Sequence, residues 1–160
     1  MSKIMKRFNL KKLIPENAIL TSFFFENSFL GIPKTLYYKI EIGLKPFIIE
    51  DETIETSIVL GFISFNIKEL KELESKTFRF QINPEKGYID GSIYLFDVHN
   101  PFDVKQITFA KFKDNMIETT FLFNIDFEFE GTDYQNINDA KMKVNLQIGE
   151  LNKDLDTENE

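Results

Sequence analysis

Ten residues in the last third of the chain, 121–130, constrain the fold more than any other segment. They read Phe-Leu-Phe-Asn-Ile-Asp-Phe-Glu-Phe-Glu, so apolar side chains occupy the odd positions and polar ones the even positions from Asn124 to Glu130. A period of two indicates a β-strand with one buried and one solvent-facing side. We therefore predict a strand over 121–130, with a phenylalanine-built core on one face and carboxylates about 7 Å apart on the other.

Similar apolar segments recur along the chain without any alternation of strands and long helices. Strands are predicted at 18–25, 36–44, 54–65, 78–82, 89–96, 105–112, 116–130 and 140–148. Turns are expected at Gly31–Pro33, Asn83–Gly87, His99–Pro101 and, as a two-residue hairpin turn, Asp114–Asn115.

One short helix is predicted from Asn66 to about Ser75, because Asn66 is a good N-cap and Glu69 follows three residues later as in a capping box. Together these elements predict a mainly β protein. We expect an antiparallel β-sandwich or open barrel of about eight strands with one short helix.

The length of 160 residues fits one domain with a substantial core. We expect a single β domain at 18–149, preceded by a basic leader at 1–17 and followed by an acidic flexible tail at 150–160. No apolar run is long enough to span a bilayer, no signal peptide is recognised, and cysteine is absent. These features predict a cytoplasmic protein that does not engage a membrane.

The net charge of −7 argues against direct nucleic-acid binding, because phosphate contacts need lysine and arginine. Negative charge keeps a protein soluble, but it also suits a basic protein partner. The candidate partner-binding residues, in order of preference, are Glu130 and Asp133, then Asp126 and Glu128, then Glu50, Asp51, Glu52 and Glu55, with Tyr134 and Tyr37 as exposed aromatic anchors.

An alternative explanation of the acidic stripe is pairing with the last strand. In one register that keeps the apolar faces together, Glu128 lies opposite Lys141 and Asp126 lies opposite Lys143. We favour this explanation slightly for Asp126 and Glu128. It leaves Glu130 and Asp133, at the loop end of the strand, as the better candidates for contact with another molecule.

Sequence motifs for catalysis are absent. His99 is the one imidazole, and with Asp97 and Asp103 it would make a poor site for a first-row metal, which prefers several imidazole or thiolate ligands. No Gly-x-Ser-x-Gly or glycine-rich phosphate loop is present. We therefore predict no enzyme, no cofactor and no metal, and we rank an enzyme based on His99 last.

The segment from Gly91 to Val104 reads Gly-Ser-Ile-Tyr-Leu-Phe-Asp-Val-His-Asn-Pro-Phe-Asp-Val, and 127–131 reads Phe-Glu-Phe-Glu-Gly. From the first of these segments through the second, the C-terminal half resembles small bacterial proteins that accompany polymorphic toxins, the immunity proteins of contact-dependent growth inhibition systems. The resemblance implies stoichiometric binding of a cognate toxin domain, with its active site blocked. Many such toxins are nucleases with basic clefts, and an acidic inhibitor would suit them.

A second possibility stays open at this point. The chain would be a non-catalytic β-sandwich that binds a small apolar ligand inside, or calcium. The loop 131–139 offers oxygen ligands from Asp133, Asn136, Asn138 and Asp139, although their spacing does not match an EF-hand.

Overall fold

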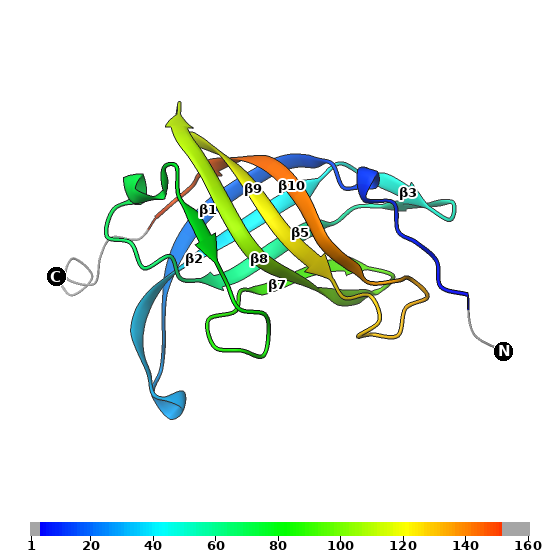
Figure 1. Cartoon of the computed structure of the whole chain (residues 1–160), viewed down its shortest axis with the longest axis horizontal. Helices are drawn as coiled ribbons and strands as arrows, with labels where there is room; N and C mark the ends of the chain where they lie inside the picture. The colour runs from blue at the N-terminus through cyan, green and yellow to red at the C-terminus, as the bar shows by residue number, and fades with distance from the viewer. Residues whose placement is uncertain (1–3, 152–160) are drawn as a thin grey trace.

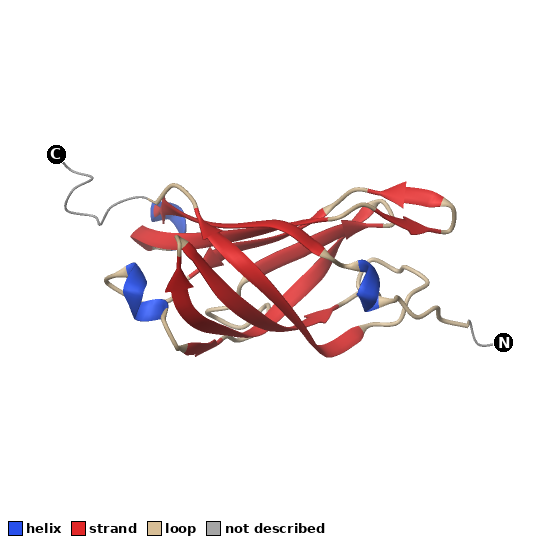
Figure 2. Cartoon of the chain, turned by 90° about the horizontal axis from the view of Figure 1, so that it is seen from above, coloured by secondary structure: helices blue, strands red, loops and turns tan. Residues whose placement is uncertain are grey.

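The computed structural model describes residues 4–151, which fold into a single β-barrel (Figures 1 and 2). The strands are β1 (Pro15–Asn27), β2 (Ile32–Leu44), β3 (Phe47–Ile49), β4 (Glu52–Ile54), β5 (Ser57–Ile63), β6 (Thr77–Arg79), β7 (Asp90–Leu95), β8 (Val98–Lys113), β9 (Met116–Ile125) and β10 (Ile137–Ile148). Among the described residues there are also three short 3-10 helices: η1 (Leu10–Lys12) before β1, η2 (Ser28–Leu30) between β1 and β2, and η3 (Leu70–Leu73) between β5 and β6.

Seven strands close the barrel in the order β8-β7-β5-β2-β1-β10-β9, and β9 pairs again with β8. β6 pairs with residues 106–108 of β8, on the same edge of that strand where 98–101 pair with β7, and β3 and β4 form a separate hairpin. The mainly β prediction is confirmed, but the sheet is closed and mixed, because β1 and β10 run parallel. Closure removes the two open sheet edges that a sandwich or an open barrel would keep.

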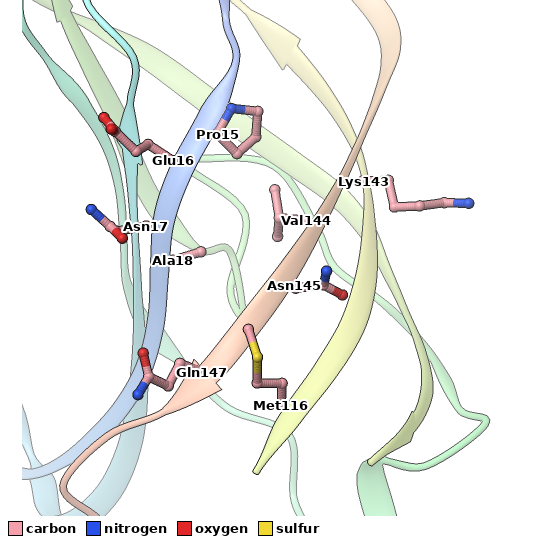
Figure 3. A pocket seen from close by; sticks show the side chains of 9 residues that line it. All are labelled: Pro15, Glu16, Asn17, Ala18, Met116, Lys143, Val144, Asn145 and Gln147. Carbon is pink, nitrogen blue, oxygen red and sulfur yellow. The ribbon is translucent and has the colours of Figure 1, made fainter. Parts of the chain in front are cut away.

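The closing seam between β1 and β10 is short. Its register covers Ile19 opposite Gln147 and Leu20 opposite Ile148, and the Gly149 amide donates to the Leu20 carbonyl at 2.8 Å. Towards the start of both strands the seam widens into a recess of about 340 Å³, flanked by Ala18 and Val144 (Figure 3). The barrel is therefore held shut at one end of this seam.

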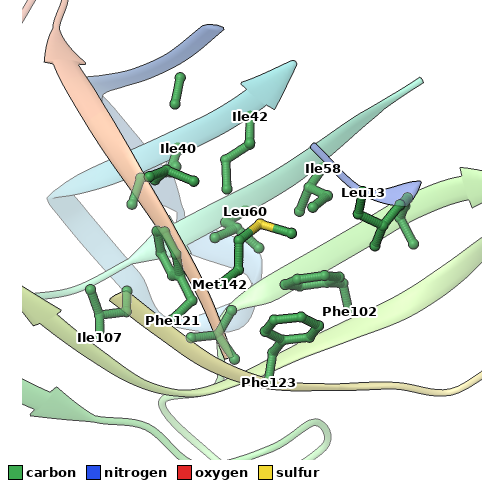
Figure 4. Close-up of a cluster of buried hydrophobic side chains, with 14 of the residues drawn as sticks. Leu13, Ile40, Ile42, Ile58, Leu60, Phe102, Ile107, Phe121, Phe123 and Met142 are labelled. Atoms are coloured by element: carbon green, nitrogen blue, oxygen red, sulfur yellow. The ribbon is translucent and has the colours of Figure 1, made fainter. Parts of the chain in front are cut away.

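Phenylalanine and branched aliphatic side chains fill the barrel interior (Figure 4). Phe102 and Phe123 stack with their ring centroids 4.3 Å apart, and Phe121 is fully buried beside them. The prediction of a phenylalanine-built core is confirmed. The buried side chains of the strands therefore pack against one another inside the barrel.

The predicted pairing of the acidic stripe is wrong. β9 ends at Ile125, and Lys141 lies opposite Leu122 while Lys143 lies opposite Thr120, six residues from the predicted register. The parity is kept, so the apolar faces still coincide. The shift arises because 126–136 form a wide loop instead of extending the hairpin, and Lys143 lies 3.8 Å from Glu118.

The predicted helix at 66–75 is also wrong, because only the 3-10 helix η3 forms there. Asn66 and Ser75 have φ of 54° and 58°, which a right-handed helix does not accommodate. The Glu72 carboxylate accepts the Glu69 amide at 2.6 Å, so a capping contact exists three residues later than expected. Leu73 anchors this turn in the core.

The corner predicted at His99–Pro101 lies inside β8 instead. The chain reverses at Phe96 and Asp97, which both have positive φ, as a tight two-residue hairpin turn requires. Asp114 and Asn115 also have positive φ, and they form the turn predicted between β8 and β9.

Substitution of Gly91 in β7 tests how tightly the barrel wall is packed. A Cβ at this position would lie 2.2 Å from the Phe102 carbonyl oxygen and 2.9 Å from Leu60 Cδ2. We expect Gly91→Ala to lower the free energy of unfolding by about 3 kcal/mol, measured by urea denaturation. Gly61→Ala on the neighbouring strand is the matched control, because its Cβ would lie 3.6 Å from the nearest atom. Equal stabilities of the two variants would contradict this packing.

Candidate functional site

The segment before β1 packs into one end of the barrel. Phe8 is only 5% exposed, and its ring lies 5.6 Å from Phe127 and 6.2 Å from Tyr134, between centroids. The Lys6 amide donates to the Asp133 carbonyl at 2.7 Å, and the Gln135 amide donates to the Lys6 carbonyl at 2.8 Å. Lys6 is thus hydrogen-bonded to the loop 126–136, and Phe8 packs against it. The basic composition of 1–17 did not indicate this attachment.

Acidic side chains from separate parts of the chain meet at this end. Glu50 and Asp51 lie in the β3–β4 turn, Glu52 begins β4 and Glu55 follows it, Asp97 lies in the β7–β8 turn, and Glu130 and Asp133 lie in the loop 126–136. We call this set, all of it exposed, the acidic rim; it consists of Glu50, Asp51, Glu52, Glu55, Asp97, Glu130 and Asp133.

Two recesses lie within the acidic rim, and they share Glu50 and Phe96. The first, of about 320 Å³, is lined by Lys6, Glu50, Phe96, Val98 and 130–134. The second, of about 280 Å³, is lined by 49–50, 52–55 and 94–97. Candidate residues about eighty positions apart in the sequence therefore border one continuous surface.

A lysine sits inside this acidic surface. Lys6 Nζ pairs with Glu50 Oε1 and lies 5.8 Å from the centroid of the Tyr134 ring. The hydrogen bond and the charge of Glu50 raise the pKa of Lys6 above its ordinary value. Both side chains are about half exposed, so the pair adds little to stability, but it shows that a cation is accommodated here.

Tyr134 is buried rather than exposed, contrary to the expectation from the sequence. It is 9% exposed and stacks on Phe96 with centroids 4.3 Å apart. Burial, and then the nearby Glu50 charge, raise the pKa of its hydroxyl. Tyr134 supports the rim from below. Two exposed apolar side chains lie close in sequence to rim residues: Ile48 in β3, at 58% exposure, and Phe129 in the loop 126–136, at 71%.

The sequence did not single out these two. Phe129 was assigned to the buried face, because strand periodicity was extended past Ile125.

Asp126 and Glu128 shape the loop instead of joining the rim recesses. Asp126 Oδ1 accepts the Phe129 amide at 3.0 Å. The Glu128 amide donates to Asn136 Oδ1 at 2.9 Å, and the Asn136 amide donates back to Glu128 Oε2 at 3.3 Å. These bonds fold 126–136 back on itself, and so they set the positions of Glu130 and Asp133.

Two of the four calcium ligands suggested by the sequence have other partners. Asn136 Oδ1 bonds the Glu128 amide, and Asp139 Oδ1 pairs with Lys105 Nζ at 2.5 Å. Within 4–151, no group of three or more His, Cys, Asp or Glu side chains is arranged to hold a metal ion. His99 is exposed, and its ring packs against Tyr94 at 5.0 Å between centroids.

Comparisons of the chain with protein-family models, with curated proteins and with solved structures gave no match. Among the helices of the described residues, none is long and apolar enough to cross a membrane.

Asp103 on β8 is expected to make the stability of the protein depend on pH. It is half-buried, and burial first, then the charge of Asp126, raise the pKa of its carboxyl above the ordinary value of 3.8. An aspartate whose pKa is raised on folding lowers the stability progressively as pH rises from its ordinary pKa to the raised one, and the full cost remains at higher pH. We expect Asp103→Asn to raise the melting temperature at pH 7 and to lose this advantage as pH falls to about 3. A gain that is equal at both pH values would contradict the assignment.

Proposed function

We propose that this protein is a non-catalytic inhibitor that binds a basic protein domain through the acidic rim, in the manner of an immunity protein that covers the active-site cleft of a nuclease toxin. The observation that carries the proposal is the meeting of Glu50, Glu52 and Glu55 with Glu130 and Asp133 around two adjoining recesses. Seven exposed carboxylates on one end of a small domain create a local negative potential well beyond that of an evenly charged surface.

Charge complementarity gives such a surface a specific advantage. A basic cleft built to hold nucleic-acid phosphates attracts clustered carboxylates in the same way, which speeds the encounter and disfavours uncharged competitors. The rim also offers Ile48 and Phe129 as exposed apolar contacts, which a purely electrostatic surface would lack. The partner expected from this surface is basic and has apolar positions beside its cleft.

The rim is also held in one arrangement before binding. Glu50 and Asp51 have φ of 49° and 69°, as a tight two-residue turn between β3 and β4 requires. The hydrogen bonds of Asp126, Glu128 and Asn136 hold the loop 126–136 folded back on itself. Phe8 and Tyr134 pack beneath them. A surface that is already ordered loses less conformational entropy on association, so more of the interaction free energy remains as affinity.

The first experiment is a pull-down from native cell extract with the whole chain as bait, at about 50 mM and about 500 mM salt. We expect a basic partner that is retained at low salt and released at high salt. The partner is then purified, and its activity is titrated with the inhibitor. Complete inhibition at one equivalent supports the proposal. A retained partner that keeps its full activity contradicts the inhibitory role.

Charge-neutral variants locate the interface. We expect Glu130→Gln combined with Asp133→Asn to weaken binding at least tenfold and to reduce its salt dependence, as measured by titration calorimetry. Glu85→Gln combined with Asp114→Asn removes the same charge outside the rim and is the matched control. If both pairs change the affinity equally, net charge alone accounts for binding, and the rim has no special part in it.

A variant that removes a positive charge from the rim completes the test. Lys6→Gln removes the ammonium group that pairs with Glu50, which makes the rim more negative. We expect association with the basic partner at low salt to become about two- to threefold faster, measured by stopped flow. Slower association would mean that Lys6 itself contacts the partner.

A further inference from the structure

A groove of about 530 Å³ lies on the outer face of β1, β2, β5 and β7, which are neighbours in the barrel wall (Figure 1). Thr21, Lys39 and Gly61 line it, and each is adjacent in sequence to a fully buried residue, so strand alternation directs these positions outward. The groove shares no lining residue with the two recesses of the acidic rim. It is therefore separate from both the core and the rim.

Strand pairing places Gly61 on the floor of the groove. Gly61 pairs with Asp90 of β7 on one side, and on the other side residues 61 and 62 lie opposite Lys39 of β2. Lys39 and Asp90 are thus two strands apart, with about 10 Å between their Cα atoms. A Cβ on Gly61 would lie 3.6 Å from its nearest neighbour, the Asp90 carbonyl oxygen. The space above Gly61, between the two charged side chains, is therefore open.

An aromatic side chain forms one wall of the groove. Phe62 belongs to a β-bulge and has φ of 56°, which is unfavourable for a bulky side chain. Its ring is 38% exposed and packs edge-on against Phe23, Phe25 and Tyr37, at 5.3, 5.1 and 5.4 Å between centroids. None of these four rings belongs to the core of the described residues. Backbone strain that holds a ring at the surface is more typical of a binding site than of core packing.

Two groups of opposite charge face the open floor. Within residues 4–151, Lys39 has no carboxylate at ion-pair distance, and Asp90 has no cation at that distance. An anionic ligand would be attracted by Lys39 and repelled by Asp90, and a cationic ligand would meet the reverse. A ligand that carries both charges, with an apolar group against Phe62 and Phe23, complements the whole groove.

We propose that this groove binds a zwitterion with an apolar side chain, of the class of free aromatic amino acids. The ammonium group of the ligand faces Asp90, its carboxylate faces Lys39, and its ring lies over Gly61 against Phe62. Lysine has a flexible four-carbon stem, so Lys39 can reach over the floor to a carboxylate close to the ammonium group. The volume lies within the range of small-ligand sites. Because such a ligand has few atoms, we expect a Kd of about 1 mM.

Titration of the isotope-labelled whole chain with L-phenylalanine, followed by NMR of the backbone amides, tests the proposal. We expect saturable shifts at Lys39, Gly61 and Asp90 with a Kd of about 1 mM in about 50 mM salt. N-acetyl-L-phenylalanine lacks the ammonium group and L-phenylalaninamide lacks the carboxylate, so each should bind at least about fivefold more weakly.

Two outcomes of this titration would overturn the proposal. The first is the absence of saturable shifts at these amides up to about 20 mM phenylalanine, well above the expected Kd. The second is equally tight binding of N-acetyl-L-phenylalaninamide, which carries neither charge. The groove would then recognise an apolar segment of a polypeptide, and the two charged side chains would have no part in it.

Substitutions separate the charge of the groove from its shape. We expect Lys39→Gln to weaken phenylalanine binding at least about fivefold. Lys141→Gln, an exposed lysine on β10, removes the same charge outside the groove and should leave the affinity unchanged. Gly61→Val fills the floor and should abolish binding, with a thermal melt to show that the variant is folded. The proposal is wrong if the two lysine variants bind equally, or if folded Gly61→Val binds as the native chain does.

Discussion

The fold of this protein depends on a contact of two residue pairs, where Ile19 meets Gln147 and Leu20 meets Ile148. All other neighbouring strands in the ring pair antiparallel and are joined by longer ladders. Without the parallel contact, the same strands would form an open, twisted sheet with two exposed edges. Closing the ring turns the inward faces of all seven strands toward one another, which allows rings such as Phe102 and Phe123 to stack in a common core. It also fixes which connections gather at each end of the barrel.

Local periodicity in the sequence captured the strands but not their closure. Alternation identified most of the strands, and the turn at Asp114–Asn115 followed from the tolerance of these two residues for positive φ. The helix at 66–75 failed because helical spacing of Ile67, Leu70 and Leu73 does not exclude left-handed residues at the ends of the segment. The strand predicted to end at 130 extends past the true end of β9 at Ile125, since Phe127 continues the apolar alternation and is buried although it lies in a loop. The parallel seam joins residues more than 120 positions apart, and no local pattern encodes it.

At the candidate site too, the sequence identified individual residues but not their arrangement in space. Charge counting selected most of the rim carboxylates, because acidic residues stand out in any segment. It gave no indication that the β3–β4 turn and the loop 126–136 would border shared recesses, which follows only from the order of strands around the ring. Lys6 and Asp97 were overlooked as rim residues, since one lies in a segment of opposite charge and the other was weighed only as a neighbour of His99. Conversely, Asp126 and Glu128 were expected to be charges for contact with a partner or with the last strand. In the structure their carboxylates accept hydrogen bonds from backbone amides of their own loop.

The packing of Phe8 against Phe127 and Tyr134 has a consequence for the order in which the protein matures during its synthesis. A ribosome releases Phe8 early, but the rings that receive it emerge more than a hundred residues later, and β10 follows them. Throughout this interval the early strands have neither the closing seam nor the support beneath the rim. The acidic surface is therefore expected to become organised late, after β10 has been added and the segment around Phe8 has folded in against the loop 126–136. A nascent or truncated chain that carries most of the carboxylates would still lack the arrangement that these carboxylates have in the closed barrel.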